Sequence, residues 1–209
     1  MSNKKKIVIF ASGTGSNFVA IYNQIEKGYI NGDIVLLISN KSNCTAVDFA
    51  KKHNISTAII NKDVINDRAK HQEFLLDKII SVKADLIVLA GYLKMIPEKV
   101  ILKYKNRILN IHPSLLPKFG GKGYYGMKVH QAVIDSKELF TGATVHFVNA
   151  KYDDGPILFQ KKIKIENDDT ISISEKVLKI EHEILPYTVE AFCDDRIHWK
   201  NNKPLIIGT

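Results

Sequence analysis

Apolar runs of strand length alternate with stretches of helical period over the first half of the chain. The runs at 34–39 and 85–90 are almost continuously apolar, which is typical of strands buried on both faces. Between such runs the apolar residues recur at helical spacing. The pattern predicts, in chain order, strand 7–10, helix 16–27, strand 34–39, helix 43–53, strand 57–60, helix 67–82, strand 85–90, helix 97–104 and strand 108–111.

The last third of the chain has a different pattern. Two strands, 144–149 and 157–165, are separated only by a short connection that contains Asp153, and this predicts an antiparallel pair. A long helix over 172–193, with a bend at Pro186, follows. We therefore predict an α/β fold whose sheet is doubly wound and mostly parallel, with an antiparallel C-terminal strand pair and a long C-terminal helix.

Composition supports a packed globular protein. The 209 residues are 45% hydrophobic and 25% charged. No apolar run approaches the roughly 18 residues of a membrane span, so no membrane partner is expected. The basic start at 4–6 precedes an apolar run that ends at Ser12, too short for a signal peptide. We therefore expect a cytoplasmic protein. The two cysteines, Cys44 and Cys193, form no CxxC pair, and we expect both to be reduced.

Charge and histidine spacing narrow the choice of ligand. The net charge of +8 and the pI of 9.3 are compatible with nucleic acid, but the lysines are scattered rather than gathered in one run. A diffuse positive field equally attracts small anions such as phosphate esters. The seven histidines form neither H-x-x-x-H nor H-E-x-x-H, so no metal site is expected.

A glycine-containing turn, 13–17, follows the first strand and opens the first helix. Backbone N–H groups at a helix N-terminus favour an anion, and a phosphate in particular. Phe18 stands where a dinucleotide fingerprint has its third glycine, and no Gly-Lys-Ser/Thr of a P-loop follows. The turn thus predicts a site for a simple phosphate ester; the alternative is a plain tight turn capped by Ser16.

The stretch 110–117, Asn-Ile-His-Pro-Ser-Leu-Leu-Pro, begins where a buried strand runs out. Open α/β sheets place their sites at this edge. Strand alternation puts Asn110 and His112 on the same side, and polar groups there need partners if they are buried. The pair predicts catalysis, against the alternative of a core histidine bonded to a carbonyl.

Two further segments contain candidate functional residues, but each could also be an ordinary turn or loop. The connection 153–156 offers a carboxylate that would raise the pKa of His112 if the two met, but Asp-Gly is also a common turn pair. The segment 120–126 has four glycines, which suits either a lid or a flexible surface loop.

Together these motifs identify a family resemblance. The chain resembles the phosphoribosylglycinamide formyltransferases, a folate-dependent family of purine synthesis. The matching stretches are 9–17, 88–96, 110–118, 142–148 and 153–156, in the family's order. The resemblance implies a Rossmann-like formyltransferase fold in a single domain, 1–209. About 1–105 would bind phosphate, and about 106–209 would be catalytic and bind folate.

The resemblance also implies roles for individual residues. The catalytic residues would be Asn110, His112 and Asp153, the last chosen over the adjacent Asp154 because it keeps the family spacing to His146 and Gly155. The substrate phosphate would be bound by Gly15, Ser16 and Asn17, and the rest of the substrate by Glu181. The folate would be bound by Arg68, Leu93, Lys94, Met95 and Ile96. Lys94 replaces an arginine that is common in related enzymes.

The implied reaction moves a formyl group from 10-formyltetrahydrofolate to the amine of 5'-phosphoribosylglycinamide, with His112 as an imidazolium and Asn110 donating to the oxyanion. No metal or nucleic acid would take part, and the protein would be a monomer or homodimer. Chain length favours this family over its siblings that carry an extra domain. The alternatives are a formyltetrahydrofolate deformylase-like hydrolase and a non-catalytic module that binds a phosphorylated ligand.

Overall fold

The computed structural model describes residues 4–61 and 68–208. Its chain divides into two compact units, Met1–Leu109 and Asn110–Thr209. The sequence predicted two halves that divide near residue 105, within a single domain; the single domain stays a prediction.

The first unit is built on parallel strands. These are β1 (Lys5–Phe10), β2 (Gly32–Ser39), β3 (Thr57–Ile59) and β4 (Leu86–Leu89), in the order β3-β2-β1-β4. At the centre, Ile9 pairs with Leu37 on one side and with Val88 on the other. All three side chains are fully buried, which explains why these strands are apolar throughout.

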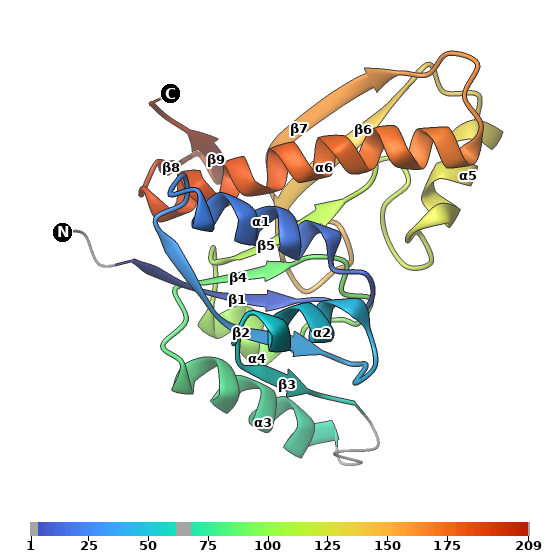
Figure 1. The fold of residues 1–209 in the computed structure, drawn as a ribbon. Coiled ribbons are helices and arrows are strands. Elements are labelled where there is room, and N and C mark those ends of the chain that lie inside the picture. Colours follow the sequence, from blue (N-terminus) through green and yellow to red (C-terminus); the bar gives the residue numbers. More distant parts are fainter. Residues whose placement is uncertain (1–3, 62–67, 209) are drawn as a thin grey trace. The chain divides into compact units, whose positions relative to one another are not determined.

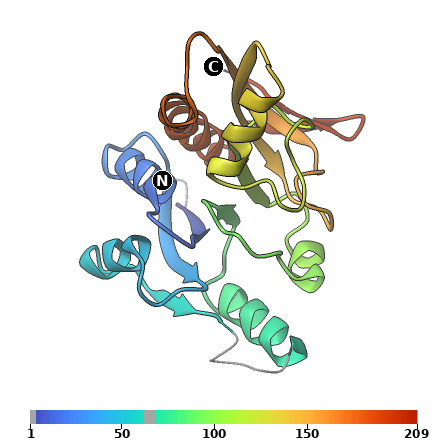
Figure 2. The same cartoon turned by 90° about the vertical axis from the view of Figure 1, so that its right-hand side faces the viewer.

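Helices cover both faces of this parallel sheet. They are α1 (Ser16–Glu26), α2 (Thr45–Lys52), α3 (Arg68–Ser81) and α4 (Glu98–Lys103). Helices α1 and α2 contact each other on one face, and α3 and α4 contact each other on the opposite face (Figures 1 and 2). The doubly wound arrangement predicted from sequence is therefore confirmed.

The boundary between the units falls within β5 (Ile108–His112). The second unit continues with α5 (Met127–Asp135), β6 (Phe140–Phe147), β7 (Ile157–Lys164), α6 (Thr170–Cys193), β8 (Ile197–Lys200) and β9 (Lys203–Ile206). Strands β6 and β7 pair antiparallel, as predicted, and β8 and β9 form a separate antiparallel hairpin.

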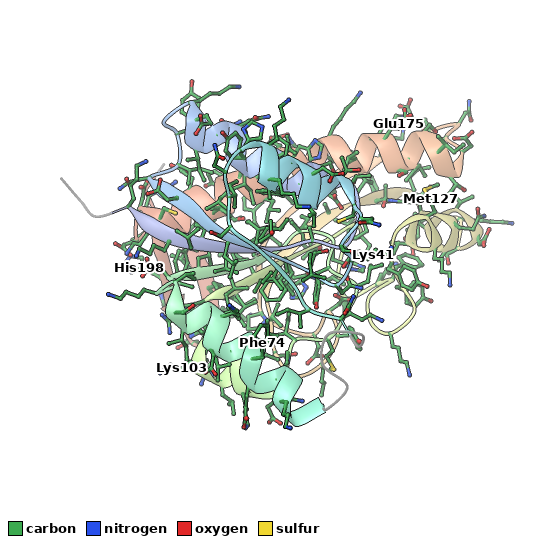
Figure 3. All side chains as sticks on the ribbon, turned by 60° about the horizontal axis from the view of Figure 1, so that its bottom comes forward. Lys41, Phe74, Lys103, Met127, Glu175 and His198 are labelled. Carbon is green, nitrogen blue, oxygen red and sulfur yellow. The ribbon has the colours of Figure 1, made fainter. Side chains whose placement is uncertain are left out.

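Helix α6 packs against both β6 and β7, and Figure 1 shows it running along this strand pair. Its first turn is closed by a capping box, in which Asp169 and Ser172 each accept from the other's backbone N–H. Ile173, Val177 and Ile184 are buried on one side, whereas Glu175 projects outward from the other (Figure 3). As predicted, Pro186 lies inside the helix.

The predicted elements are present, with ends displaced by a few residues. The predicted start of α3 at Asp67 lies outside the described residues. Strand β6 begins earlier than predicted, at Phe140, and includes Gly142, a residue that normally weakens strands. Glycine suits this position because a Cβ there would collide with the carbonyl of Lys161 in β7. Helix α5 and the β8–β9 hairpin were not predicted.

Among the described residues, no helix is both long enough and apolar enough to cross a membrane.

Candidate active site

Strand β5 carries two polar side chains at its end. Asn110 and His112 are two positions apart, so both lie on the same side of the strand. His112 is only 4% exposed, and Asn110 is half-buried. Buried polar groups require hydrogen-bond partners, and those of both residues come from the segments that follow in the second unit.

Asp153 enters the same region from the connection between β6 and β7. Its backbone is left-handed, with φ of 52°, a conformation that costs a non-glycine residue about 1 kcal/mol or more. The turn also approaches β6 very closely: a Cβ at Gly155 would collide with the carbonyl of Phe147, and the amide of Phe147 donates to the carbonyl of Pro156 at 2.9 Å. The turn at Asp154 and Gly155 is therefore tight, and it also positions the carboxylate of Asp153.

The three predicted catalytic side chains meet. Nδ1 of His112 lies 3.5 Å from Oδ2 of Asp153, and Nδ2 of Asn110 donates to Oδ1 of Asp153 at 3.4 Å. The backbone amide of Gly121 donates to Oδ2 of Asp153 at 2.9 Å. The glycine-rich segment thus contributes a bond to the site, a role that its composition alone did not predict.

A fourth side chain, His146 in β6, completes the cluster. Its Nδ1 faces the carbonyl of Phe147 at 2.9 Å, and a carbonyl only accepts, so Nδ1 carries the hydrogen. In the neutral ring Nε2 is then an acceptor, and it takes a bond from Nδ2 of Asn110 at 3.0 Å. This network fixes the orientation of the Asn110 amide, because a flipped amide would turn its oxygen toward the carboxylate of Asp153.

The pKa of the His112 imidazole is lowered from 6.5, because burial outweighs the opposing effects of Asp153 and of the Phe119 carbonyl. The direction of this shift favours the neutral ring and argues against the sequence-based hypothesis of a cationic His112. Burial disfavours ionisation of Asp153 too, but its contacts with His146, His112 and Gly121 outweigh it and lower the pKa of the carboxyl from 3.8. Asp153 is ionised.

The hydrogen on His112 can be assigned from its other contact. Nε2 lies 2.8 Å from the carbonyl oxygen of Phe119, which can only accept, so Nε2 carries the hydrogen of the neutral ring. Nδ1 then presents its lone pair to Oδ2 of Asp153. Two electron-rich atoms face each other across 3.5 Å, and a proton placed between them would complete a charge-assisted hydrogen bond.

The adjacent carboxylates of Asp153 and Asp154 differ sharply in environment. The Asp153 side chain is 12% exposed and contacts His112, whereas the Asp154 side chain is 53% exposed. Asp154 accepts from the amide of Asn149 and lies 4.0 Å from the ammonium of Lys151. Only Asp153 is therefore placed to exchange a proton with the histidine.

The predicted phosphate segment lies in the first unit, at the start of α1. Gly15 is the N-cap, with φ of 73° and no side-chain cap, so Ser16 does not cap the helix as the alternative required. A Cβ at Gly15 would come within 2.7 Å of the Cβ of Ala46, which leaves room for glycine only. Asn17 is buried in the first turn. An uncapped helix N-terminus retains the anion-attracting geometry expected from the sequence.

The predicted folate segment, residues 93–96, follows β4 in the same unit. The backbone N–H of Leu93 donates to Oγ of Ser12 at 3.3 Å, which ties this segment to the turn that leads into α1. Leu93 and Met95 are about half exposed, whereas Ile96 is buried. Lys94 is exposed. Apolar side chains that face solvent suit a flat ligand better than they suit a core.

The last two predicted residues are placed individually. Arg68 is the first residue of α3, but its side chain lies outside the described residues. Glu181 is buried in α6. Within residues 4–61 and 68–208, no group of three or more His, Cys, Asp and Glu side chains is arranged to hold a metal ion.

Sequence reasoning missed three groups of the cluster: the His146 ring, the Phe119 carbonyl and the Gly121 amide. His146 lies in a stretch that supported the family resemblance, so its pattern was visible although its contact with Asn110 was not. The two backbone groups had no sequence signal, because their roles come from loop conformation; Phe119, for example, has φ of 56°.

The chain is similar to known proteins over most of its length. A family model described as formyl transferase matches residues 5–189. The chain is 43% identical over 205 residues to the chloroplastic phosphoribosylglycinamide formyltransferase of Vigna unguiculata, covering 97% of this chain and 66% of that relative. It is 34% identical over 205 residues to the phosphoribosylglycinamide formyltransferase of Haemophilus influenzae, covering 98% and 94%.

Solved structures show the same fold. Glycinamide ribonucleotide transformylase 1 from Symbiobacterium toebii superposes with a TM-score of 0.91 at 27% identity, covering 100% of this chain and 96% of that one.

Proposed function

The chain belongs to the formyl transferase family, and from this premise we propose that it transfers the formyl group of 10-formyltetrahydrofolate to the primary amine of 5'-phosphoribosylglycinamide, a step of de novo purine biosynthesis. The names of the relatives at 43% and 34% identity support this choice of substrates. The observation that carries the proposal is the meeting of His112 with an ionised Asp153 at the end of β5.

The reaction requires a proton to be moved. The substrate amine attacks the formyl carbon and forms a C–N bond, so the amine nitrogen must lose a proton. The N10 atom of the folate must gain one before its own C–N bond breaks. The lone pair of His112 Nδ1 and the Asp153 carboxylate provide a place for this proton, since it would be shared across their 3.5 Å gap before it passes to N10.

The carbonyl oxygen becomes negatively charged during attack, and a hydrogen-bond donor must stabilise it. Asn110 suits this role because its amide nitrogen has two hydrogens. The bond to His146 at 3.0 Å holds the amide in place, whereas the bond to Asp153, at 3.4 Å, is the weaker of the two. During the reaction the second hydrogen would leave Oδ1 of Asp153, the weaker acceptor, and be donated to the oxyanion.

Other residues would hold the two substrates. The helix N-terminus at Gly15, Ser16 and Asn17 would bind the substrate phosphate, and Glu181 would contact the remainder of that substrate. Leu93, Lys94, Met95, Ile96 and Arg68 would contact the folate. These roles follow from motif matches. The monomeric or homodimeric state, the cytoplasmic location and the absence of a nucleic-acid partner stay predictions from the sequence.

One assay tests the reaction. The protein is incubated with 10-formyltetrahydrofolate, with and without 5'-phosphoribosylglycinamide, and the release of tetrahydrofolate is followed. Release that depends on the ribonucleotide and matches formylated product one to one supports the proposal. Release that ignores the ribonucleotide indicates a hydrolase, and binding of both compounds without release indicates a non-catalytic module.

A further inference from the structure

A buried hydroxyl in β6 holds the loop that follows β5. Thr144 is fully buried, and its Oγ1 donates to the carbonyl of Ser114 at 2.6 Å. The same oxygen accepts from the backbone N–H of Leu116 at 3.1 Å and from Nε2 of Gln160 at 2.8 Å. A hydroxyl has one hydrogen to donate and two lone pairs, so every bond available to Thr144 is made.

Gln160, in β7, supplies the other half of this arrangement. Besides Thr144, its Nε2 donates to the carbonyl of Leu116 at 3.0 Å, so both amide hydrogens have acceptors. Gln160 is itself exposed, between the half-buried Phe159 and Lys161 on the last strand of the sheet order, and it lies in no motif that suggested function. Thr144 and Gln160 together form a loop clamp.

The clamped segment leads directly to the catalytic histidine. Oγ of Ser114 donates to the carbonyl of Lys118 at 2.7 Å, which carries the restraint to the far end of the loop. The next residue, Phe119, has left-handed backbone and directs its carbonyl at Nε2 of His112, 2.8 Å away. Hydrogen bonds thus restrain residues 114–119 along their length, from the clamp at Ser114 and Leu116 to Phe119. The carbonyl of Phe119 in turn selects the tautomer of His112.

We propose that Thr144 and Gln160 are positioning residues: by fixing residues 114–119 they aim the Phe119 carbonyl at His112 and keep the Nδ1 lone pair directed at Asp153. The kinetic consequence rests on the proposed function. The tautomer itself belongs to the protein without substrates, so it can be observed whatever reaction the protein catalyses.

The decisive variant is Gln160→Met, because this side chain lies near the surface and the change leaves the β7 backbone intact. Lys164→Met, on the same strand and also exposed, is the matched control. We expect kcat of Gln160→Met to fall about 10-fold to 100-fold, as for misplaced catalytic groups. KM for both substrates should change less than about twofold, because binding groups are untouched. Lys164→Met should match wild type.

Nitrogen NMR of the imidazole rings, recorded without substrates, reads the tautomer directly. The wild-type His112 ring should show one neutral tautomer protonated at Nε2, and Gln160→Met should show a mixture of the two. Thr144→Val should behave like Gln160→Met, whereas Thr144→Ser, which keeps the hydroxyl, should retain the single tautomer and most of kcat.

The proposal is overturned if Gln160→Met and Thr144→Val keep the single Nε2-protonated tautomer, or if the loss of activity appears in KM rather than kcat. Equal losses in Thr144→Ser and Thr144→Val would also overturn it, because the hydroxyl would then not matter. An inactive wild type that still shows the clamp-dependent tautomer would remove the proposed function and leave the positioning role standing.

Discussion

Nδ1 of His112 lies 3.5 Å from Oδ2 of Asp153, and the hydrogen on the other ring nitrogen is held by the carbonyl of Phe119. This relationship makes the pair an acceptor for one proton. The neighbouring carboxylate, Asp154, faces solvent and contacts Lys151 instead. Of these two adjacent aspartates, only Asp153 can share a proton with the histidine. The difference arises because the two side chains point in different directions from one tight turn.

The two aspartates should respond differently to neutralisation. Asp153→Asn removes the charge that stabilises a proton on His112, so kcat should fall at least about 100-fold, the lower end of the effect of a positioned acid–base group. Asp154→Asn, an equal change on the exposed neighbour, should leave kcat within about threefold of wild type. His112→Ala should resemble Asp153→Asn. Steady-state kinetics decide this, and equal losses in both aspartate variants would exclude the assignment.

The pH dependence of activity should report the lowered pKa of His112. The proton acceptor must be neutral, so kcat/KM should fall as the pH drops through the pKa of this ring in the free enzyme. Because burial lowers that pKa, the midpoint of the acid limb should lie below 6.5. A midpoint above 6.5 would mean that Asp153 outweighs burial and that the ring begins as a cation.

Gly155 should be intolerant of a side chain. A Cβ there would meet the carbonyl of Phe147, so Gly155→Ala must displace the turn that carries Asp153. We expect the free energy of unfolding to fall by about 1–3 kcal/mol, as for overpacked sites. Urea denaturation measures this, with Gly13→Ala as the control because a Cβ at Gly13 meets nothing within 4 Å. Equal stability of the two variants would show that the turn accommodates a Cβ at Gly155 without a loss of stability.

Stability should decline in mildly acidic solution. Burial lowers the pKa of His112 and of His130 from 6.5, so below pH 6.5 the unfolded chain binds protons that the folded chain does not. The free energy of unfolding therefore decreases as the pH falls below 6.5, by up to about 1.4 kcal/mol per pH unit for each such histidine. Above that pH both states are neutral and the effect vanishes.

His130 offers a direct check on this pH dependence. It is buried in α5, and its Nδ1 has no hydrogen-bond partner within the described part of the chain. His130→Leu should flatten the curve of unfolding free energy against pH between 7 and 5, measured by urea denaturation at each pH. A variant curve parallel to that of wild type would show that His130 does not contribute to acid sensitivity.

Much of the fold could be predicted because its signals are local. The apolar runs of β1, β2 and β4 specify strands buried on both faces, and the period of the intervening segments specifies helices. Helix α5 and the β8–β9 hairpin were missed because each is short and gains its stability from packing; Trp199 of β8, for example, contacts Phe147 of β6 with ring centroids 5.0 Å apart.

The sequence by itself determined that Asn110 and His112 share one side of a strand end, because strand alternation requires it, and that a short Asp-Gly turn joins two antiparallel strands. Only the tertiary structure decided which aspartate reaches the histidine, that His146 orients the Asn110 amide, and that burial overrides Asp153 in lowering the pKa of His112. Those outcomes depend on distances and solvent exclusion among residues from separate segments, and both exist only once the chain has folded.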